Sequence, residues 1–574
     1  MAAASAEFGT VNFVVMVAFL VATLAIGVFY GLRGHEAHRL LISRDMGVAP
    51  VSLSIMATFL SAILIVGTPS EIFYFGLEWA VAVLTFPIAV VISATLFLPI
   101  FFRLGLISVY EYLGRRYNSR LMTVVGTLAF MTQNLLYTGI ALYAPTIVLS
   151  NVTGISNWLA ICVVGLVGTS YTAFGGFQAV IWADVMQALV MISGVLSIII
   201  QGCINVGGFS QMLAVNREHG RLTMFTWDIN PLQRHNFWNT FFGQLFMWTS
   251  LLGVNQPAVQ RLLSLPTYKK AALTSIIGGF MMTMMCSLAV IAGLAIFATY
   301  ATCDPLRSGV TERRDELVPH FMADQLGHVP GLGGLFIACV LSGALSTISS
   351  SLNSLAACTW EDFFRDSACT AGLTDRGRRW ALRGIALVFG VASIGMAFLA
   401  KNMGGVLQIA IGVYGGCTGP ILGLFCMALF VPFSNRAGAT VGLVAGLCVA
   451  LWASFGASFS GASPPVMMPT RQDGCLANTT TIITNATQPE SAIVDKSALE
   501  TFYSISYMLY SVLGFVTTTI TAIIVSLLTG GLKAEVDGEH LSPVVKCLAP
   551  KKKYRLSHIN GTSNTGFEME AIKK

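Results

Sequence analysis

Oxygen-bearing side chains gather within one apolar stretch of the sequence, residues 333–359. Its centre reads LSGALSTISSSLNS over residues 341–354. Four of its polar positions share one face of a helix: 342, 346, 349 and 353. Hydroxyl and amide oxygens are hard, neutral ligands, which suit a small monovalent cation that must bind and leave again. The alternative is that these hydroxyls bond to carbonyls of their own helix or hold neighbouring helices together.

Two other apolar stretches are interrupted by glycine and proline. Residues 61–69 read SAILIVGTP, and residues 248–257 read WTSLLGVNQP. Where a membrane helix unwinds, its carbonyls lose their partners, so they must line a cavity or bind a cation. Interruptions at matching positions of two halves are typical of a transporter's binding site. A pair of ordinary proline kinks is the alternative.

Few charged residues fall within apolar stretches. Asp184 lies about six residues inside the stretch 178–203, and a carboxylate in a membrane span is a functional candidate. We expect it to serve as a cytoplasmic exit point for the cation, or else to be an interfacial acid paired with a basic residue. Glu71 is expected to cap loosened backbone, and Glu361 and Asp362 to form a solvated helix end.

Composition identifies the elements that must position these residues. The chain has 574 residues, of which 55% are apolar and 10% charged. Soluble domains carry about 25% charged residues, so this chain cannot cover a water-facing surface. A soluble enzyme, a nucleic-acid-binding protein and a disordered scaffold are excluded. No His/Cys cluster or pair of catalytic carboxylates predicts an enzyme, a cofactor or a metal other than the proposed cation.

The sequence predicts an all-α polytopic membrane protein with thirteen transmembrane helices, each long enough for a hydrocarbon core of about 30 Å. The predicted spans are 10–32, 50–75, 79–102, 121–149, 155–174, 178–203, 237–256, 271–300, 333–359, 379–400, 404–432, 437–458 and 502–528. Without the first span, two runs of five follow, and an odd number inverts the second run relative to the first.

The predicted regions follow from this order. They are an extra helix and cytoplasmic loop (1–49), a ten-helix core (50–432) built from inverted repeats (50–203 and 237–432), two further helices (433–528) with an external loop (459–501), and a basic tail (529–574).

Orientation follows from the basic residues. Most of the 33 Lys and Arg residues lie in cytoplasmic segments when the N-terminus is extracellular and the C-terminus cytoplasmic. The loop 459–501 is then external, so Asn478 and Asn485 are expected to be glycosylated. Cys303 and Cys475 lie in external loops, where a disulfide between them is an open alternative to two free thiols.

Longer motifs resemble one known family. YTAFGGFQAVIWAD (171–184), GVNQ (253–256) followed by Gln260-Arg261, and SGALST (342–347) resemble the sodium:solute symporter family. The resemblance implies a LeuT-like five-plus-five inverted repeat, Na⁺ as the coupling ion and a small organic solute as the cargo, with the bilayer as the surroundings. Two further motifs are similar to the branch of monocarboxylate, multivitamin and iodide transporters: LYTG (136–139) and PLQRH (231–235).

The resemblance also implies site residues. Backbone carbonyls and hydroxyls would bind sodium at Ala57, Leu60, Gly343, Ser346 and Thr347. Side chains of a central cavity would bind the solute: Phe59, Ala62, Leu64, Tyr137, Trp248, Gln408 and Ile411.

Two positions depart from the family pattern. Leu64 stands where iodide transporters carry an amide, which disfavours iodide. Tyr74, within FYFG, stands where the family commonly carries arginine, which weakens the expectation of an anionic solute. We therefore expect a plasma-membrane symporter that imports a monocarboxylate or a vitamin-like acid by alternating access. A sodium- or solute-gated channel, or a non-transporting sensor, is the alternative on the same fold.

Overall fold

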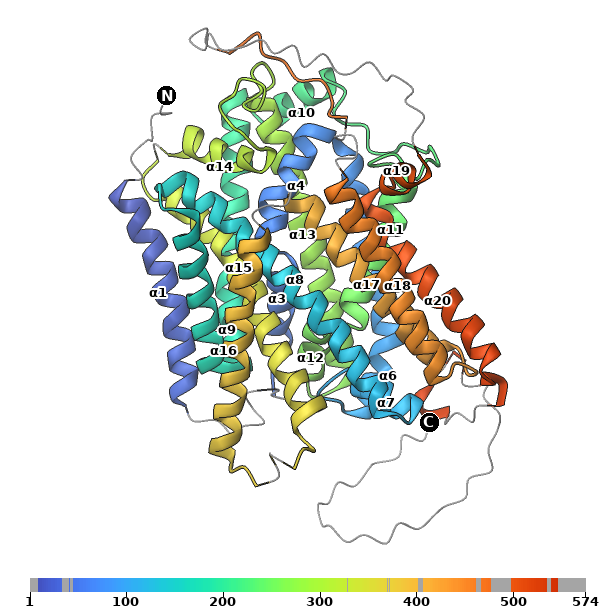
Figure 1. Ribbon diagram of the computed structural model, residues 1–574. Helices are drawn as coiled ribbons and strands as arrows, with labels where there is room; N and C mark the ends of the chain where they lie inside the picture. The colour runs from blue at the N-terminus through green and yellow to red at the C-terminus, as the bar shows by residue number, and fades with distance from the viewer. Residues whose placement is uncertain are drawn as a thin grey trace.

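The computed structural model describes residues 9–33, 41, 45–327, 329–368, 370, 372–400, 406–460, 466–475, 497–533, 538–542 and 544–545. These residues form helices and no β-strand, which confirms the all-α class. Figure 1 shows the long helices side by side, most running between two ends of the molecule. The expected glycosylation sites, Asn478 and Asn485, lie outside the described residues.

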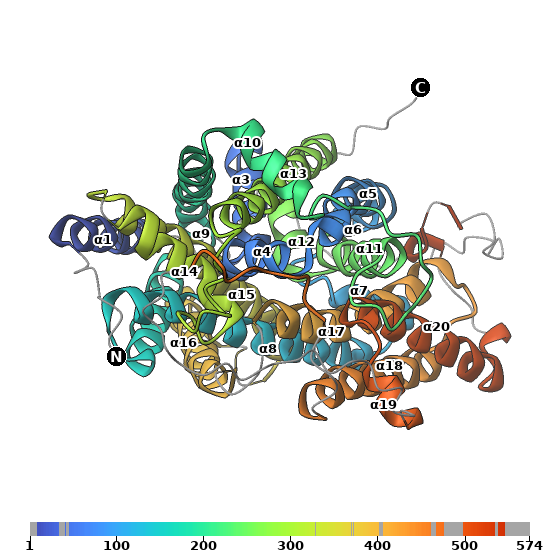
Figure 2. The ribbon, with the colours of Figure 1, turned by 90° about the horizontal axis from the view of Figure 1, so that it is seen from above.

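The first half of the chain begins with α1 (Thr10–Leu32), which packs against α9 and α15 at the edge of the molecule (Figure 2). The predicted second span is two helices, α3 (Val48–Phe59) and α4 (Ala62–Phe75), bent by 57° at their junction. A composite span follows, made of η1 (Leu77–Leu84), α5 (Thr85–Ile92), η2 (Ser93–Phe97) and α6 (Leu98–Leu104). Next come α7 (Glu111–Tyr117), α8 (Arg120–Thr153), α9 (Asn157–Val206) and α10 (Phe209–Glu218).

The second half of the chain begins after α10. Its first span is again interrupted, as α11 (Phe237–Gly253) and α12 (Gln256–Leu263). The helices that follow are α13 (Tyr268–Thr299), α14 (Leu317–Phe321), α15 (Leu332–Thr359), α16 (Asp375–Ala400), α17 (Val406–Phe430), α18 (Arg436–Phe459), α19 (Ala498–Tyr503) and α20 (Tyr510–Leu528). The two broken helices therefore lie where the sequence predicts interrupted spans, one after α1 and one after α10.

Helix α9 contains two of the predicted spans. Its 50 residues would extend about 75 Å as one straight helix, far beyond a bilayer core of about 30 Å. Gly176 breaks it with φ 68° and ψ −167°, a conformation that favours glycine. The break falls between the predicted spans 155–174 and 178–203.

The number of spans stays a prediction. Within the described residues, nine helices are long and apolar enough to cross a membrane, or ten with the bent pair α3–α4. Helix α9 counts once in that number, and α11 is only 17 residues long. Helices α15 and α17 are the most buried of these spans, and α15 packs against α1, α3, α4, α8, α9 and α16.

The two ends of the molecule differ. One, here called the disulfide end, carries α10, α14 and α19 (Figure 1) and a disulfide joining Cys303 to Cys475 with an S–S distance of 2.01 Å. The segment 466–475 lies against this end, where Met468 N donates to the Tyr74 carbonyl at 2.9 Å and Asp304 N donates to the Arg471 carbonyl at 3.0 Å. The opposite end, here called the basic end, carries α6 and α7.

Helix α15 ends differently from the expectation for Glu361 and Asp362. The sequence predicts a solvated helix end, and this is wrong for both residues: the Glu361 side chain is 6% exposed, and Asp362 is buried and accepts hydrogen bonds from Ser108 at 2.7 Å and Thr127 at 2.6 Å. Glu361 pairs with Arg365 at 2.8 Å. Two hydroxyls from distant segments compensate the buried carboxylate, a pairing that the local charge pattern does not reveal.

A substitution at Gly176 tests the break in α9. We expect Gly176→Ala to lower the melting temperature of the detergent-solubilised protein, because a side chain at this φ and ψ costs about 1–3 kcal/mol. Gly384→Ala in α16 is the matched control: an added Cβ there meets no atom within 4 Å, so its melting temperature should equal or exceed that of the wild type. A Gly176→Ala protein as stable as the wild type would contradict the break.

Candidate functional site

The junction between α3 and α4 is the centre of the site. Helical bonding in α3 ends where Leu60 N donates to the Met56 carbonyl at 3.0 Å, and Leu60 (φ −98°, ψ 81°) and Ser61 (ψ 173°) then leave helical geometry. The carbonyls at such a helix end have no backbone N–H four residues ahead. These carbonyls, including those of Ala57 and Leu60, are therefore available to other partners.

Gly343 lets α15 approach this junction closely. A Cβ atom at position 343 would lie 2.6 Å from Ala62 N and 2.9 Å from the Ser61 carbonyl carbon, closer than side-chain atoms tolerate. Glycine is thus required for the contact between the broken helix and α15.

The hydroxyls of Ser346 and Thr347 lie at the same junction. Ser346 Oγ donates to Asp184 Oδ1 at 2.6 Å. Thr347 Oγ1 lies 2.9 Å from the Gly343 carbonyl and 3.2 Å from the Thr58 carbonyl, to which it can donate. Because both hydroxyl protons point to acceptors, the oxygen lone pairs remain for a cation. The structure thus brings Gly343 and Thr347 of α15 against the junction of α3 and α4, which follows Ala57 and contains Leu60, and Ser346 lies one residue before Thr347.

The remaining hydroxyls of α15 form the two kinds of hydrogen bond named as the alternative to a cation site: bonds within their own helix and bonds to neighbouring helices. Ser342 and Ser349 bond to carbonyls of their own helix, at 2.7 Å and 3.1 Å. Others reach neighbouring helices: Ser351 Oγ donates to Asn134 Oδ1 at 3.3 Å and Ser354 Oγ to Gln260 Oε1 at 3.1 Å. The hydroxyls of α15 therefore form hydrogen bonds both within their own helix and to neighbouring helices.

Asp184 is fully buried and paired with a charge from another element. Its Oδ2 accepts from Arg261 Nη2 of α12 at 3.0 Å and from Ser54 Oγ of α3 at 2.5 Å. Arg261 is 1% exposed and also donates through Nε to Ser54 at 2.7 Å and through Nη2 to Ser350. The alternative of an acid paired with a base describes Asp184 correctly, except that the pair is fully buried, away from any interface with water.

Arg261 is a site residue that the sequence analysis did not single out. In the sequence, Arg261 appears only as part of the motif after the second interrupted helix. Nothing there pairs it with a carboxylate 77 residues away. Since α12 is the second part of the broken helix α11–α12, this ion pair connects both broken helices to α9 and α15.

Further contacts of α12 close the basic end around this pair. Gln256 donates to the Ile107 carbonyl at 2.6 Å and accepts from Val109 N at 2.8 Å. Gln260 Nε2 donates to the Leu41 carbonyl. Gln256 and Gln260 are buried, so the structure represents a conformation that is sealed at the basic end.

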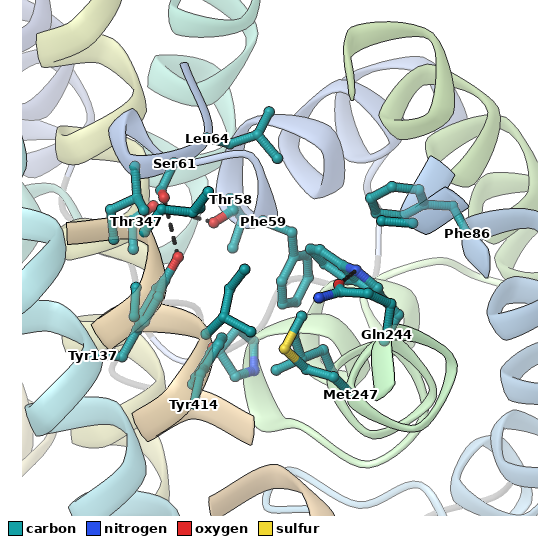
Figure 3. A pocket seen from close by; sticks show the side chains of 18 of the residues that line it. Thr58, Phe59, Ser61, Leu64, Phe86, Tyr137, Gln244, Met247, Thr347 and Tyr414 are labelled. Atoms are coloured by element: carbon teal, nitrogen blue, oxygen red, sulfur yellow. Dashed lines mark hydrogen bonds between the residues drawn. The ribbon is translucent and has the colours of Figure 1, made fainter. Parts of the chain in front are cut away.

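A central cavity lies beside the junction, between α4, α8, α11 and α17 (Figure 3). The cavity, together with the solvent space at its mouth, has a volume of about 750 Å³. Five of the seven predicted solute-binding residues line it: Phe59, Leu64, Tyr137, Trp248 and Ile411. Thr58, Ser61 and Thr347 line it too, so the cavity borders the predicted sodium site directly.

Ala62 and Gln408 lie elsewhere. Ala62 is fully buried, with its backbone against Gly343 rather than in the cavity wall. Gln408 faces a second cavity, where its Oε1 accepts from Arg234 Nη1 at 2.9 Å. The bend between α3 and α4, and the position of α17 between the two cavities, decide which residues face the central one.

Several lining residues were missed by the sequence analysis. Tyr414 stacks on Tyr137, with ring centroids 3.9 Å apart and ring planes 6° apart, and Tyr137 donates to Ser61 Oγ at 3.0 Å. Gln244, one helical turn before Trp248, accepts from Trp248 Nε1 at 3.0 Å. The four-residue spacing of Gln244 and Trp248 is a signal that could have found this pair.

Asn134 adds a polar group to the cavity wall. Its Oδ1 accepts from Ser351, whereas its buried Nδ2 has no hydrogen-bond partner among the described residues. A buried N–H donor without a partner is costly, about 1–3 kcal/mol, so this group is suited to an acceptor atom on a bound solute.

The second cavity, here called the vestibule, opens toward the disulfide end. Among its lining residues are Gly76, Glu78, Arg221, Arg234, His235, Gln408, Met468 and Tyr507. The sequence predicts that Glu71 caps loosened backbone, but its Oε1 instead pairs with Arg234, accepting a hydrogen bond from Nε at 2.7 Å and lying 2.7 Å from Nη2. Burial and the neighbouring Arg234 lower the pKa of His235 to about 3 despite the opposing effect of Glu71, so His235 is neutral near pH 7.

Tyr74, which replaces the arginine of the family pattern, faces the disulfide end. Its hydroxyl donates to Asp304 Oδ1 at 3.4 Å. Two arginines of the vestibule come instead from the segment before α11. Arg221 donates to the carbonyls of Phe73 and Pro469, and Arg234 pairs with Glu71.

Comparison with known proteins places this site in context. The model of the sodium:solute symporter family matches residues 40–446. Human sodium-coupled monocarboxylate transporter 1 is 39% identical over 97% of this chain and 95% of that protein. The sodium-dependent multivitamin transporter of Oryctolagus cuniculus is 40% identical over 92% of this chain and 84% of that protein.

Solved structures support the fold. A substrate-bound, outward-open Na⁺-coupled sialic acid symporter has a TM-score of 0.74 at 22% identity, covering 91% of this chain and 98% of its own. Mhp1, a nucleobase-cation-symport-1 family transporter, has a TM-score of 0.52 at 12% identity, covering 85% and 94%. Two broken helices, an oxygen-lined junction and a family match over most of the length lead to one conclusion: the chain belongs to the sodium:solute symporter family and is a sodium-coupled transporter.

Proposed function

We propose that this chain imports a small organic carboxylate, of the monocarboxylate or vitamin-like class, together with Na⁺ across the plasma membrane. The observation that carries the proposal is the oxygen-lined junction of α3, α4 and α15 at the wall of the central cavity. Relatives named for monocarboxylates and for vitamins cover nearly the whole chain, which supports the solute class.

In this proposal, Na⁺ binds the carbonyls of Ala57, Leu60 and Gly343 and the hydroxyls of Ser346 and Thr347. The ion would connect the two parts of the broken helix to α15 and so fix the adjoining wall of the solute cavity. Solute affinity should therefore rise with the sodium concentration, since Na⁺ restrains the surface that the solute contacts.

The cavity suits a small carboxylate with an apolar body. Aromatic and aliphatic side chains, among them Phe59, Leu64 and Trp248, would contact the body. The unpaired Asn134 Nδ2 would donate a hydrogen bond to a carboxylate oxygen. A site of this kind rejects an analogue that leaves its buried donor unpaired.

Transport requires the basic end to open. In our proposal the Asp184–Arg261 pair holds that end closed while Na⁺ and solute bind, and Asp184 orients Ser346 within the sodium site. When the pair separates, Na⁺ would leave toward the basic end past Asp184, which retains the exit role expected from the sequence.

The driving force can be bounded. At a potential of about 60 mV, one entering Na⁺ gains roughly 1.4 kcal/mol from the potential. A tenfold concentration gradient adds about 1.4 kcal/mol. An entering carboxylate loses roughly 1.4 kcal/mol against the potential, so strong accumulation of an anion needs more than one Na⁺ per cycle.

We also propose that the disulfide end is extracellular, with the N-terminus outside and the C-terminus in the cytoplasm. Helix α1 begins near the disulfide end, where Asn12 accepts from Gly331 N at 2.8 Å, and Figure 1 shows α20 running away from it toward the basic end. A disulfide fits an oxidising compartment, and arginines gather at the basic end.

Uptake into cells that express the chain tests the proposal. Labelled lactate, pyruvate, biotin, pantothenate and iodide would be offered in sodium medium and in choline medium. We expect saturable, sodium-dependent uptake of at least one carboxylate and none of iodide. Absence of sodium-dependent carboxylate uptake despite surface expression would contradict the proposal, and non-saturating flux would indicate a channel.

Substitution of Asp184 tests the closed basic end. We expect Asp184→Asn to raise the sodium concentration for half-maximal uptake and to lower the maximal rate per surface molecule by about tenfold or more, because Arg261 stays buried without its partner charge. Uptake kinetics and surface biotinylation provide the measurement.

Asp473→Asn is the matched control. Asp473 also pairs with an arginine, Arg471, but both side chains are more than half exposed, so water and salt screen their attraction. Its kinetics should equal those of the wild type. An Asp184→Asn transporter with wild-type rate and sodium dependence would rule out the role given to Asp184.

A further inference from the structure

The vestibule contains one guanidinium group held in place by aromatic rings and by a carboxylate. The Arg234 guanidinium lies 4.2 Å from the ring centroid of Phe75 and 4.8 Å from that of Tyr507. Its Nε donates to Glu71 Oε1 at 2.7 Å, and its Nη2 lies at the same distance from that oxygen. These contacts fix the plane and the direction of the group.

The hydrogen bonds of Arg234 leave part of the guanidinium for a ligand. The hydrogen bond from Nε to Glu71, the ion-pair contact of Nη2 with the same oxygen, and the hydrogen bond from Nη1 to Gln408 Oε1 engage three of its five N–H groups. The side chain is 14% exposed and lines the vestibule. Nη1 and Nη2 therefore each retain one N–H, which matches the two oxygens of a carboxylate.

Arg234 lies beside the part of α17 that separates the two cavities. Its partner Gln408 lines the vestibule, whereas Leu407 and Ile411, on the same turn of α17, line the central cavity. Leu407 also packs closely against α4, because a Cβ atom added at Gly67 would lie 2.8 Å from Leu407 Cβ. This turn of α17 therefore separates the two cavities, and Arg234 lies on its vestibule side.

Other basic groups near the vestibule are less available. Arg221 is committed to the carbonyls of Phe73 and Pro469. His235 is neutral, because burial lowers its pKa to about 3. Arg314 is not among the residues that line the vestibule, although its Cζ lies 5.3 Å from the ring centroid of Phe75. Arg234 is thus the cation best placed to receive an anion from the vestibule.

We propose that Arg234 is a docking site for the carboxylate of the solute, outside the central cavity, and that Glu71 competes with the solute for it. The inference rests on the proposed function, since it concerns an anionic solute. The carboxylate binds the two remaining N–H groups of Arg234 and then passes Gln408 into the central cavity. Arg234 therefore sets the affinity for anionic solutes rather than the rate of the conformational change.

Three substitutions test this role through the kinetics of sodium-dependent uptake, with labelled pyruvate as the probe or, if pyruvate is not carried, the best carboxylate of the uptake panel. Arg234→Gln should raise KM by about tenfold or more, the loss expected for charge-assisted hydrogen bonds, with the maximal rate per surface molecule within about twofold of the wild type. Glu71→Gln should lower KM, because the competing carboxylate is gone.

The double variant Glu71→Gln/Arg234→Gln separates binding from folding. It leaves no unpaired buried charge, so surface expression should recover, while KM should stay as high as in Arg234→Gln. If Arg234 served only to neutralise Glu71, the double variant would regain the wild-type KM, which would overturn the inference. Arg217→Gln, an exposed arginine of α10, controls for the loss of one positive charge at this end.

The outcomes for the two proposals are distinct. A wild-type chain that carries no carboxylate overturns the proposed function and this inference with it. A wild-type chain that carries carboxylates, with an unchanged KM in Arg234→Gln, overturns the docking site alone.

Discussion

The structure depends on the contact between the break in the second span and Gly343 of α15. Two residues without helical geometry, Leu60 and Ser61, release backbone carbonyls inside the molecule, and such groups are costly in a membrane unless another group satisfies them. Only glycine at position 343 lets α15 come close enough to bring its hydroxyls to these carbonyls. The central cavity, the proposed sodium site and the buried ion pair all adjoin this contact.

The two ends of the transporter are in different states. At the basic end, Arg261 and Asp184 join α12 to α9 among buried hydroxyls, so separation of these helices would expose an unpaired charge. At the disulfide end, Arg234 and Gln408 line the vestibule and bond to each other. Because Ser346 bonds to Asp184 and also belongs to the proposed sodium site, the ion and the closed end can influence each other through one side chain.

Sequence reasoning predicted the helices and the broken spans, because apolar runs and the Gly and Pro residues within them are local signals. It could not assign partners. The pairing of Asp184 with Arg261, and the burial of Asp362 against Ser108 and Thr127, join segments far apart in the chain. It placed Ala62 and Gln408 in the central cavity, whereas a 57° bend and the partition formed by α17 direct them elsewhere. Resemblance identifies positions along a helix, but packing decides which cavity they face.

The most direct test of the account is the binding of isotope-labelled sodium to the purified transporter without solute. The account predicts saturable binding by the wild type and its loss in Gly343→Ala, because an added Cβ separates α15 from the break. Gly395→Ala, where a Cβ meets no atom within 4 Å, should bind as the wild type does. Sodium binding by a folded Gly343→Ala protein with wild-type affinity would contradict the account.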